Sequence, residues 1–499
     1  MLDLVSLSAL AGALVLLAHV TIYVGALGVI PGPRKPSTAM AWLILILAVP
    51  FLGFLVFLLF GSTRVERKRQ RAQAAANARI QRRTAEVADL VASSPELATV
   101  AGVAVLNRRL GALPAVGGNT VDLFSDYPAS LEAMSAAVDS ARSFVHVEFY
   151  ITAWDDATTP FFEALVRATE RGVRVRLLFD HLGSRGIPVY RETLRRLEET
   201  SIRWHPMMPI QLLRGKVRRP DLRNHRKILV VDGTCAFAGS QNLIEASYDK
   251  AKNHRAGRAW VELMARITGP AVTELNAVFL TDWYSETGEI PLENAAIAGS
   301  TSGPTSGPAS GPARDDGATV QVVPSGPGFT TENNLRMFTT LIYAAQRRIS
   351  LTSPYFVPDE SLLYAVTTAA QRGVDVELFV GAQGDQFMVH HAQRSYYQSL
   401  LSAGVHIHLY PAPWVLHAKH FTIDDQVAVL GSSNMDLRSF ALNYEVSLMV
   451  VDPEVVARVR EVEDTYRAVS RELTEQEWSA RGWGARYVEN VMRLTSALQ

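Results

Sequence analysis

The chain has 499 residues, 48% of them hydrophobic, and its 49 basic and 49 acidic residues give a formal net charge of zero. This length is enough for two or three domains with well-formed cores. Zero net charge argues against a protein that coats nucleic acid, and a single cysteine, Cys235, excludes a disulfide bond within the chain. Because Cys235 falls in an apolar run, where free cysteine packs as a small hydrophobic side chain, we do not expect a catalytic thiol.

Two apolar runs, residues 4–30 and 39–61, lie near the start of the sequence. Each exceeds the roughly 20 residues that a helix needs to cross a bilayer, and Pro50 in the second run is tolerated within a membrane. They predict a two-helix transmembrane hairpin within residues 1–62. A cleaved signal peptide is the alternative for the first run, but that run has no basic start and is followed by a second apolar run.

A basic connector, residues 63–118, follows the second run, whereas the loop between the runs has only Arg34 and Lys35. By the positive-inside rule, the segment after residue 61 is cytoplasmic, which predicts a multi-pass protein of the cell membrane. The cluster could also attract anionic lipid headgroups, or it could form a solvated helix without a specific partner. It comprises Arg64, Arg67, Lys68, Arg69, Arg71, Arg79, Arg82 and Arg83.

From Asn119 onward, strand and helix patterns alternate, and the same order occurs twice. A strand at 144–151, an amphipathic helix at 161–171 and a strand at 173–179 are matched by segments at 349–356, 362–372 and 374–380. This duplication of about 200 residues predicts an α/β fold of two similar units, 119–295 and 319–499, related by pseudo-twofold symmetry. The Gly/Ser/Pro-rich linker between them, residues 296–318, is expected to be disordered.

Both units carry one polar string, His-x-Lys-x4-Asp-x6-Gly-Ser-x-Asn, and a second matched copy is not expected by chance. Each string predicts two short strands around an aspartate turn, with the histidine and lysine on one sheet face. The first copy comprises His225, Lys227, Asp232, Ser240 and Asn242, and the second comprises His417, Lys419, Asp424, Ser432 and Asn434.

These residue types suit the chemistry of a phosphodiester. Imidazole can act as a nucleophile or a general acid near neutral pH, and lysine and asparagine donate hydrogen bonds to an oxyanion. Two copies facing each other would place two histidines on opposite sides of one phosphorus. One histidine would attack it, the other would protonate the leaving alkoxide, and a second acceptor would release the phosphohistidine. The lysines, asparagines and serines supply the charge and donors, so we expect no metal and no other cofactor.

The doubled string resembles that of the phospholipase D superfamily, and along nearly its whole length the chain is similar to the bacterial cardiolipin synthases. The resemblance implies two phospholipase D-like units, with His225 as the nucleophile and His417 as the acid. Glu445 matches the carboxylate that orients the second histidine, His417, and Glu262 is the expected counterpart for His225. Lys227, Lys419, Asn242 and Asn434 would hold the phosphoryl oxygens, with Ser240 and Ser432 nearby. Asp232 and Asp424 belong to the catalytic motif, although their place at the turns favours a structural role.

The resemblance also implies phosphatidylglycerol and membrane lipids as partners, no nucleic acid, and a catalytic domain on the cytoplasmic side. We expect transfer of a phosphatidyl group between two phosphatidylglycerols, which yields cardiolipin and glycerol without a nucleotide. Hydrolysis by a phospholipase D remains the alternative, because it shares the first step. A catalytically silent lipid-binding protein is disfavoured by the two intact motifs, and a nuclease by the apolar runs and the neutral charge.

Three other features have open interpretations. Five histidines could be considered as metal ligands, but no carboxylate cluster accompanies them in the sequence. They are His390, His391, His406, His408 and His420. The basic run from Arg214 to Lys227 has two interpretations: it guides anionic lipid headgroups toward the first motif, or it is a solvated loop. The segment around Trp478, Trp483 and Tyr487 packs on the second unit or forms an interfacial amphipathic helix.

Overall fold

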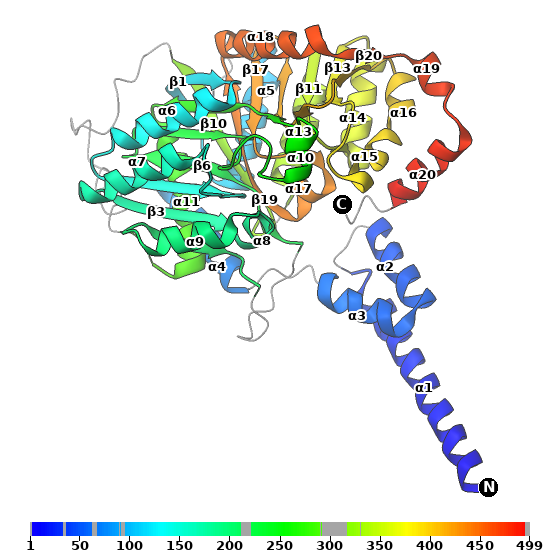
Figure 1. Ribbon diagram of the computed structural model, residues 1–499. Helices are drawn as coiled ribbons and strands as arrows, with labels where there is room; N and C mark the ends of the chain where they lie inside the picture. Colours follow the sequence, from blue (N-terminus) through cyan, green and yellow to red (C-terminus); the bar gives the residue numbers. More distant parts are fainter. Residues whose placement is uncertain are drawn as a thin grey trace. The chain divides into compact units, whose positions relative to one another are not determined.

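The computed structural model describes residues 2–32, 36–61, 67–88, 90, 95–210, 221–289, 291, 317–329 and 331–494 (Figure 1). The expectations for the linker core at 299–312, for Arg64 and for Arg214–Arg219 lie outside these residues. The described chain divides into two compact units: an N-terminal unit up to Arg67, which also includes Asp221, and a larger unit that comprises the other described residues from Lys68 onward.

The N-terminal unit consists of α1 (Leu2–Val29), α2 (Pro36–Ala48) and α3 (Pro50–Phe60). Among the described residues, only the segment Leu10–Val29 of α1 is long and apolar enough to cross a membrane, with a mean hydropathy of 2.1. Its side chains are almost entirely unburied within the protein. The first predicted span is therefore present as one helix.

The second predicted span, residues 39–61, is not one helix. The chain leaves the helical conformation at Val49 (φ −138°, ψ 79°), directly before Pro50, because the proline ring disfavours a helical residue before it and lacks an amide hydrogen. The helices α2 and α3 then fold back on each other, with the rings of Trp42 and Phe57 5.4 Å apart. A two-helix transmembrane hairpin is therefore not confirmed. One span-length helix is followed by two short ones.

The larger unit is built on one mixed sheet. Its strands run in the order β20-β14-β13-β11-β16-β17-β19-β10-β1-β9-β7-β6-β2-β3-β4. The strands of the first half are β1 (Val116–Phe124), β2 (Phe144–Phe149), β3 (Arg174–Asp180), β4 (Arg203–Met207), β6 (Lys227–Val231), β7 (Cys235–Gly239) and β9 (Met264–Thr268). Those of the second are β10 (Ala318–Ser325), β11 (Arg348–Thr352), β13 (Asp375–Gly381), β14 (His406–Tyr410), β16 (His420–Ile423), β17 (Val427–Gly431), β19 (Asn443–Val451) and β20 (Arg471–Leu473).

From β14 to β4 the strand order is palindromic about the antiparallel pair β1–β10, where Val116 faces Val320, and β20 is an additional edge strand of the second half. Each half contains a parallel pair (β2–β3 and β11–β13) and an antiparallel hairpin (β6–β7 and β16–β17) at equivalent places. This arrangement confirms the predicted duplication. The halves are not separate bodies, because they share one continuous sheet.

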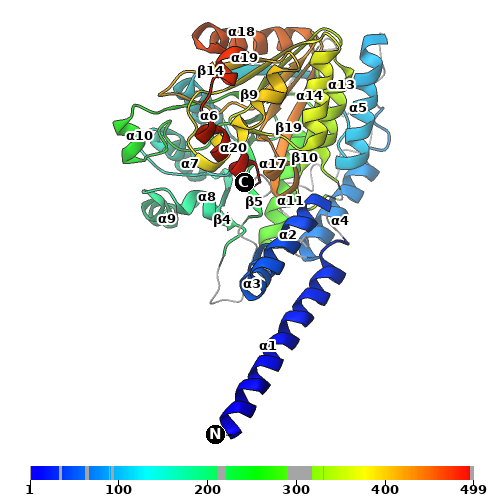
Figure 2. The same ribbon diagram turned by 90° about the vertical axis from the view of Figure 1, so that its right-hand side faces the viewer.

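Helices cover both faces of the sheet, which gives an α/β/α sandwich (Figure 1). On one face, α6 (Tyr127–Asp139) and α7 (Thr159–Glu170) cover the first half, and α5 (Pro95–Gly111), α13 (Asn333–Ala344) and α14 (Glu360–Gln371) lie side by side over the second (Figure 2). On the other face, α11 (Ala271–Thr287) and α18 (Pro453–Val469) share one apolar core with both halves. The remaining helices are α4 (Arg67–Arg83), α8 (His181–Arg185), α9 (Tyr190–Glu198), α10 (Ala251–Arg255), α15 (Phe387–Arg394), α16 (Tyr397–Leu401), α17 (Leu437–Ala441), α19 (Glu475–Ser479) and α20 (Trp483–Leu494).

The apolar strands explain this layering. Every residue of β2 is buried: Val145 and Val147 point to the α6–α7 side, whereas Phe144 packs toward α11. Such a strand needs a helix layer on each face, because its side chains alternate between the two. Cys235 packs in this core, as its apolar context predicted.

The C-terminal segment packs on the second half, which is one of the two interpretations offered for it, and the interfacial role stays a prediction. Glu489 of α20 is buried and accepts hydrogen bonds from Arg394 and Arg481, so one face of the helix packs on the second half. The opposite face leaves Trp483 77% and Tyr487 56% exposed. Among the basic residues of the connector, Arg69 is buried rather than solvated, and it pairs with Asp282 and Glu286 of α11.

Candidate active site

The two polar strings begin the hairpins β6–β7 and β16–β17, and their glycines make room for a neighbouring strand. A Cβ on Gly239 would lie 2.3 Å from the carbonyl oxygen of Leu263, and one on Gly431 would lie 2.3 Å from that of Val446. Only glycine avoids this clash. In each half, the motif therefore lies directly against the segment that contains Glu262 or Glu445.

The serines that follow these glycines tie down that same segment. The hydroxyl of Ser240 accepts a hydrogen bond from the amide of Leu263 (2.9 Å), and the hydroxyl of Ser432 accepts one from the amide of Val446 (3.0 Å). Both serines are fully buried, and neither lines the central cavity. Their hydroxyls hold the backbone next to each glutamate, and the expected role of both serines at the substrate phosphate stays a prediction.

Each histidine is connected to the opposite half by one short pair of parallel strands. Strand β5 (Arg223–Asn224) pairs with Asn443 and Tyr444 of β19, and the His225 amide donates to the Tyr444 carbonyl at 2.8 Å. Strand β15 (Val415–Leu416) pairs with β8 (Trp260–Val261), and the His417 amide donates to the Val261 carbonyl at 2.8 Å. Each histidine is therefore placed by a strand next to the other half's glutamate, since Glu445 lies in β19 and Glu262 directly follows β8.

This crossing reverses the predicted histidine–glutamate pairs. Nδ1 of His225 lies 3.0 Å from both carboxylate oxygens of Glu445, and Nδ1 of His417 lies 2.7 Å from Oε1 of Glu262. Both glutamates were correctly chosen as partners, but each orients the histidine of the opposite half. The reason is the backbone pairing across the pseudo-twofold axis, which sequence spacing does not reveal.

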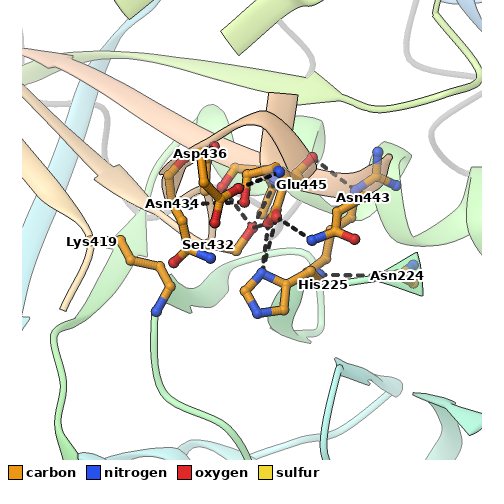
Figure 3. A network of polar contacts seen from close by, with 12 residues as sticks. Asn224, His225, Lys419, Ser432, Asn434, Asp436, Asn443 and Glu445 are labelled. Atoms are coloured by element: carbon orange, nitrogen blue, oxygen red, sulfur yellow. Dashed lines mark hydrogen bonds and ion pairs between the residues drawn. The ribbon is translucent and has the colours of Figure 1, made fainter. Parts of the chain in front are cut away.

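Glu445 is held from several sides (Figure 3). The Ser432 hydroxyl donates to its Oε2 at 2.5 Å, and the Asn443 amide donates to its Oε1 at 3.3 Å. Asn443 was not anticipated from the sequence, and nothing in its spacing marks it. With Nδ1 of His225 facing this carboxylate, Nε2 is left to face the substrate.

The lysines lie beside their histidines. The ammonium of Lys227 donates to the His225 carbonyl and that of Lys419 to the His417 carbonyl, each at 2.6 Å. Lys419 Nζ also lies 3.1 Å from Nε2 of His417. The spacing had correctly indicated that each lysine accompanies its histidine.

The asparagines of the two strings lie at the cavity, whereas the aspartates lie at the hairpin turns. Asn242 and Asn434 line the cavity that also contains both histidines. Asp232 accepts hydrogen bonds from the amides of residues 142–144, and Asp424 accepts them from the amides of residues 346–348. Both aspartates sit at turns in the left-handed region, with φ of 51° and 48°. They hold the start of β2 and β11, at the far end of the hairpin from the histidines, which is the structural role that the turn positions favoured.

One cavity of about 580 Å³ receives both halves of the site. His225 and His417 both line it, and aromatic rings flank them: Tyr150 lies 4.8 Å from the His225 ring, and Tyr248 lies 6.4 Å from the His417 ring. Apolar side chains of Ile151, Leu182, Ile187, Met388, Val389 and Trp260 form much of the remaining wall. The two imidazoles therefore share one substrate-sized space.

Burial and the two lysines lower the pKa of His225 well below its usual value, with His417 adding to the effect. Burial also lowers the pKa of His417, but the adjacent Glu262 carboxylate opposes that shift. His225 is therefore the more readily neutral imidazole, as a nucleophile must be, and His417 is the more readily protonated. Burial lowers the pKa of Lys419 to about 8 and raises that of Glu445 to about 7.

The histidines considered as metal ligands do not gather. His406, His408 and His420 pair with Glu472, Glu377 and Glu463 respectively, while His390 and His391 lie on α15. Within the described residues, one group of three possible ligands comes together, Glu245, Asp249 and His254, in which His254 Nε2 lies 2.9 Å from Glu245.

Comparison with known proteins gives the family. The family profile described as "Cardiolipin synthase, PLD-like domain" matches residues 134–283 and 338–465, together more than half of the chain. The chain is 33% identical over 470 residues to Cardiolipin synthase A of Yersinia pseudotuberculosis serotype IB (strain PB1/+), covering 93% of each protein. This chain belongs to the cardiolipin synthase family of phospholipase D-like proteins.

A second relative and a second family profile also match this chain, and one solved structure shares its fold. Cardiolipin synthase A of Pectobacterium carotovorum subsp. carotovorum (strain PC1) is 32% identical over 469 residues. A profile described as "Phospholipase_D-nuclease N-terminal" matches residues 15–62, the N-terminal helices. The fold is also that of the phosphatidylserine synthase of Haemophilus influenzae Rd KW20, with a TM-score of 0.58 and 15% identity over 79% of this chain and 99% of that one.

Proposed function

We propose that this protein is a phosphatidyltransferase that makes cardiolipin and glycerol from two phosphatidylglycerols through a phosphohistidine. The observation that carries the proposal is the pair of imidazoles, each with its own carboxylate, lining one cavity in a member of the cardiolipin synthase family. One phosphodiester bond is broken and another is formed, so the exchange requires no nucleotide.

In the first step, Nε2 of His225 attacks the donor phosphorus while Glu445 holds the Nδ1 proton. The bond from phosphorus to the glycerol oxygen breaks, and His417 gives its Nε2 proton to that oxygen, releasing glycerol. Lys227, Lys419, Asn242 and Asn434 are proposed to stabilise the phosphoryl oxygens as negative charge accumulates on them. Glu262 stabilises the imidazolium form of His417 before it donates.

In the second step, the hydroxyl of another phosphatidylglycerol approaches on the side that glycerol has left. His417, now neutral, takes the hydroxyl proton on Nε2, the oxygen attacks phosphorus, and the bond from phosphorus to His225 breaks. Both histidines return to their starting protonation, as a two-step displacement requires. The apolar side chains in the cavity wall, such as Ile151, Leu182 and Ile187, would limit competition from water at the phosphohistidine.

Membrane attachment through α1 is supported by its length and its unburied apolar surface. The expected multi-pass arrangement requires residues 39–61 to cross as well. However, α2 has 13 residues and α3 has 11, so they would span only about 20 Å and about 17 Å of a core that is roughly 30 Å thick. We propose that α1 crosses once and that α2 and α3 enter and leave on one side. Arg34 and Lys35 then share the cytoplasmic side with the basic connector and the catalytic unit, in agreement with the positive-inside rule.

Product analysis tests the proposed reaction. Full-length protein is supplied with phosphatidylglycerol in mixed micelles, and lipids and free glycerol are quantified. Cardiolipin and glycerol in equal amounts are the expected result. Phosphatidic acid as the sole lipid product would replace the transferase proposal with a phospholipase D-type hydrolase.

A further inference from the structure

The segment between Tyr248 and Trp260 has a cluster of cations that the two-histidine chemistry does not use. Lys250, Lys252 and Arg258 all line the cavity that contains His225 and His417. Among the residues that the structure describes, none of these three side chains has a hydrogen-bond or ion-pair partner. The two acidic residues of the same cavity are already engaged, since Asp385 accepts from the Tyr355 hydroxyl and Asp436 caps α17. The cavity therefore offers positive charge to a ligand.

This segment lies on the His417 side of the site. The ring of Tyr248, at its start, is 6.4 Å from the His417 ring and is packed at 4.5 Å on Trp260, at its end. Trp260 belongs to β8, which pairs with β15 directly before His417. On the His225 side, the nearest ring is that of Tyr150. The three cations are thus tied to the histidine that handles the leaving and entering alcohol.

The backbone at the start of this segment is strained. Tyr248 and Asp249 are consecutive non-glycine residues with φ of 59° and 49°. Conformations of this kind cost free energy and are retained where the surroundings enforce them, often at binding sites. Here the strained turn directly precedes Lys250 and directs the chain into α10, where Lys252 lies.

The second substrate requires an anion site in this position. An entering phosphatidylglycerol differs from water or glycerol because it has a phosphodiester of its own, separated from the attacking hydroxyl by the glycerol headgroup. When that hydroxyl is beside His417, its phosphodiester must occupy the adjoining part of the cavity. Lysine and arginine side chains without partners are the groups that bind such an oxyanion.

We propose that Lys250, Lys252 and Arg258 form an acceptor subsite that binds the phosphodiester of the entering phosphatidylglycerol. The inference rests on the proposed function and assigns it a second phosphate site, distinct from the reacting phosphorus between the histidines. It also gives a reason for transfer over hydrolysis, since the subsite raises the local concentration of an oriented hydroxyl beside His417.

The test distinguishes an effect on the binding of the acceptor from an effect on the reaction with the donor. Full-length protein in mixed micelles makes cardiolipin from phosphatidylglycerol, and it also exchanges labelled glycerol into phosphatidylglycerol, a reaction that forms the same phosphohistidine but has an uncharged acceptor. For Lys250→Ala, Lys252→Ala and Arg258→Ala, cardiolipin synthesis should fall about ten-fold each, while glycerol exchange changes by less than about two-fold. Lys250→Arg and Lys252→Arg, which keep the charge, should restore most of the synthesis.

Arg255→Ala is the matched control, because Arg255 is an exposed cation of the same helix that does not line the cavity. Unchanged synthesis in the alanine variants would overturn the subsite. An equal fall in synthesis and exchange would overturn it as well, because the cations would then attract anionic lipid generally or support the fold. A wild-type protein that exchanges glycerol but makes no cardiolipin would instead overturn the proposed function.

Discussion

Nδ1 of His417 lies 2.7 Å from Glu262, a residue of the other half, while Glu445, from its own half, lies 3.0 Å from His225. Each half therefore supplies the orienting carboxylate for the other half's imidazole. The site is complete only when the two halves share the sheet across β1 and β10.

This crossing predicts opposite phenotypes for the two glutamates. Glu445→Gln should slow phospho-enzyme formation about 10²- to 10⁴-fold with every donor, since it removes the carboxylate that orients the nucleophile. Glu262→Gln should slow it mainly with poor leaving groups, because it weakens the acid. Rates with glycerol and nitrophenol leaving groups measure the difference. The reverse assignment would hold if Glu262→Gln affected all donors equally and Glu445→Gln did not.

The histidines themselves give a second prediction. His225→Ala should abolish labelled phospho-enzyme and turnover, because no other nitrogen of the site replaces its Nε2. His417→Ala should still form phospho-enzyme slowly from a donor with a good leaving group, which needs no acid. Acid-labile label on the quenched protein is the measurement. Full activity of His225→Ala would exclude it as the nucleophile, and a His417→Ala defect independent of the leaving group would exclude its acid role.

Lys419 should set an alkaline limit to activity. Its pKa is lowered by burial to about 8, so the ammonium is charged below that pH and neutral above it. Because the charged form binds the phosphoryl oxygens, its loss should add a further fall in kcat/KM of about ten-fold per pH unit above about pH 8, beyond the decline that deprotonation of His417 causes at lower pH. Lys419→Arg, whose guanidinium stays charged, should move this limit to higher pH. A pH–rate profile of both proteins checks the shift, and an identical alkaline limb in the two would assign it to another group.

Arg69 connects the first helix of the larger unit to the strand of Glu445. It is buried, pairs with Asp282 at 3.2 Å and lies 4.5 Å over the ring of Tyr444, whose carbonyl accepts from the His225 amide. Arg69→Ala should reduce the free energy of unfolding by about 3–5 kcal/mol, because it breaks a buried ion pair. Exposed Arg71 on the same helix is the control, and Arg71→Ala should change stability by less than about 0.5 kcal/mol. Thermal unfolding of the purified proteins decides, and equal melting temperatures would show that Arg69 is dispensable.

The N-terminal helices give a prediction about topology. In a Cys235→Ala background, single cysteines at Lys35 and Arg71 should both react with a membrane-impermeant maleimide only from the cytoplasmic side, and a cysteine at Asp3 only from the opposite side. This follows if α1 crosses once and α2 and α3 return to the side they entered. Labelling of the Lys35 position from outside the cell would instead support two complete crossings.

The sequence alone predicted most of the chemistry that we propose for this protein. Two copies of one polar string, about 200 residues apart, indicated the duplicated α/β units, both histidines and both lysines, and the aspartate turns, because each depends on local spacing and strand periodicity. Glu262 and Glu445 were also found as candidates. Resemblance to the cardiolipin synthases then gave the reaction.

Tertiary structure decided what depends on contacts between distant segments. Each glutamate pairs with the opposite histidine because β5 pairs with β19 and β8 pairs with β15 across the pseudo-twofold axis. The hydroxyls of Ser240 and Ser432 likewise bind backbone amides of the neighbouring segment. The break at Val49, the burial of Arg69 and the cations beside His417 likewise arise from packing. A repeat along one chain specifies two equal halves, and only their association determines which residue of one faces which residue of the other.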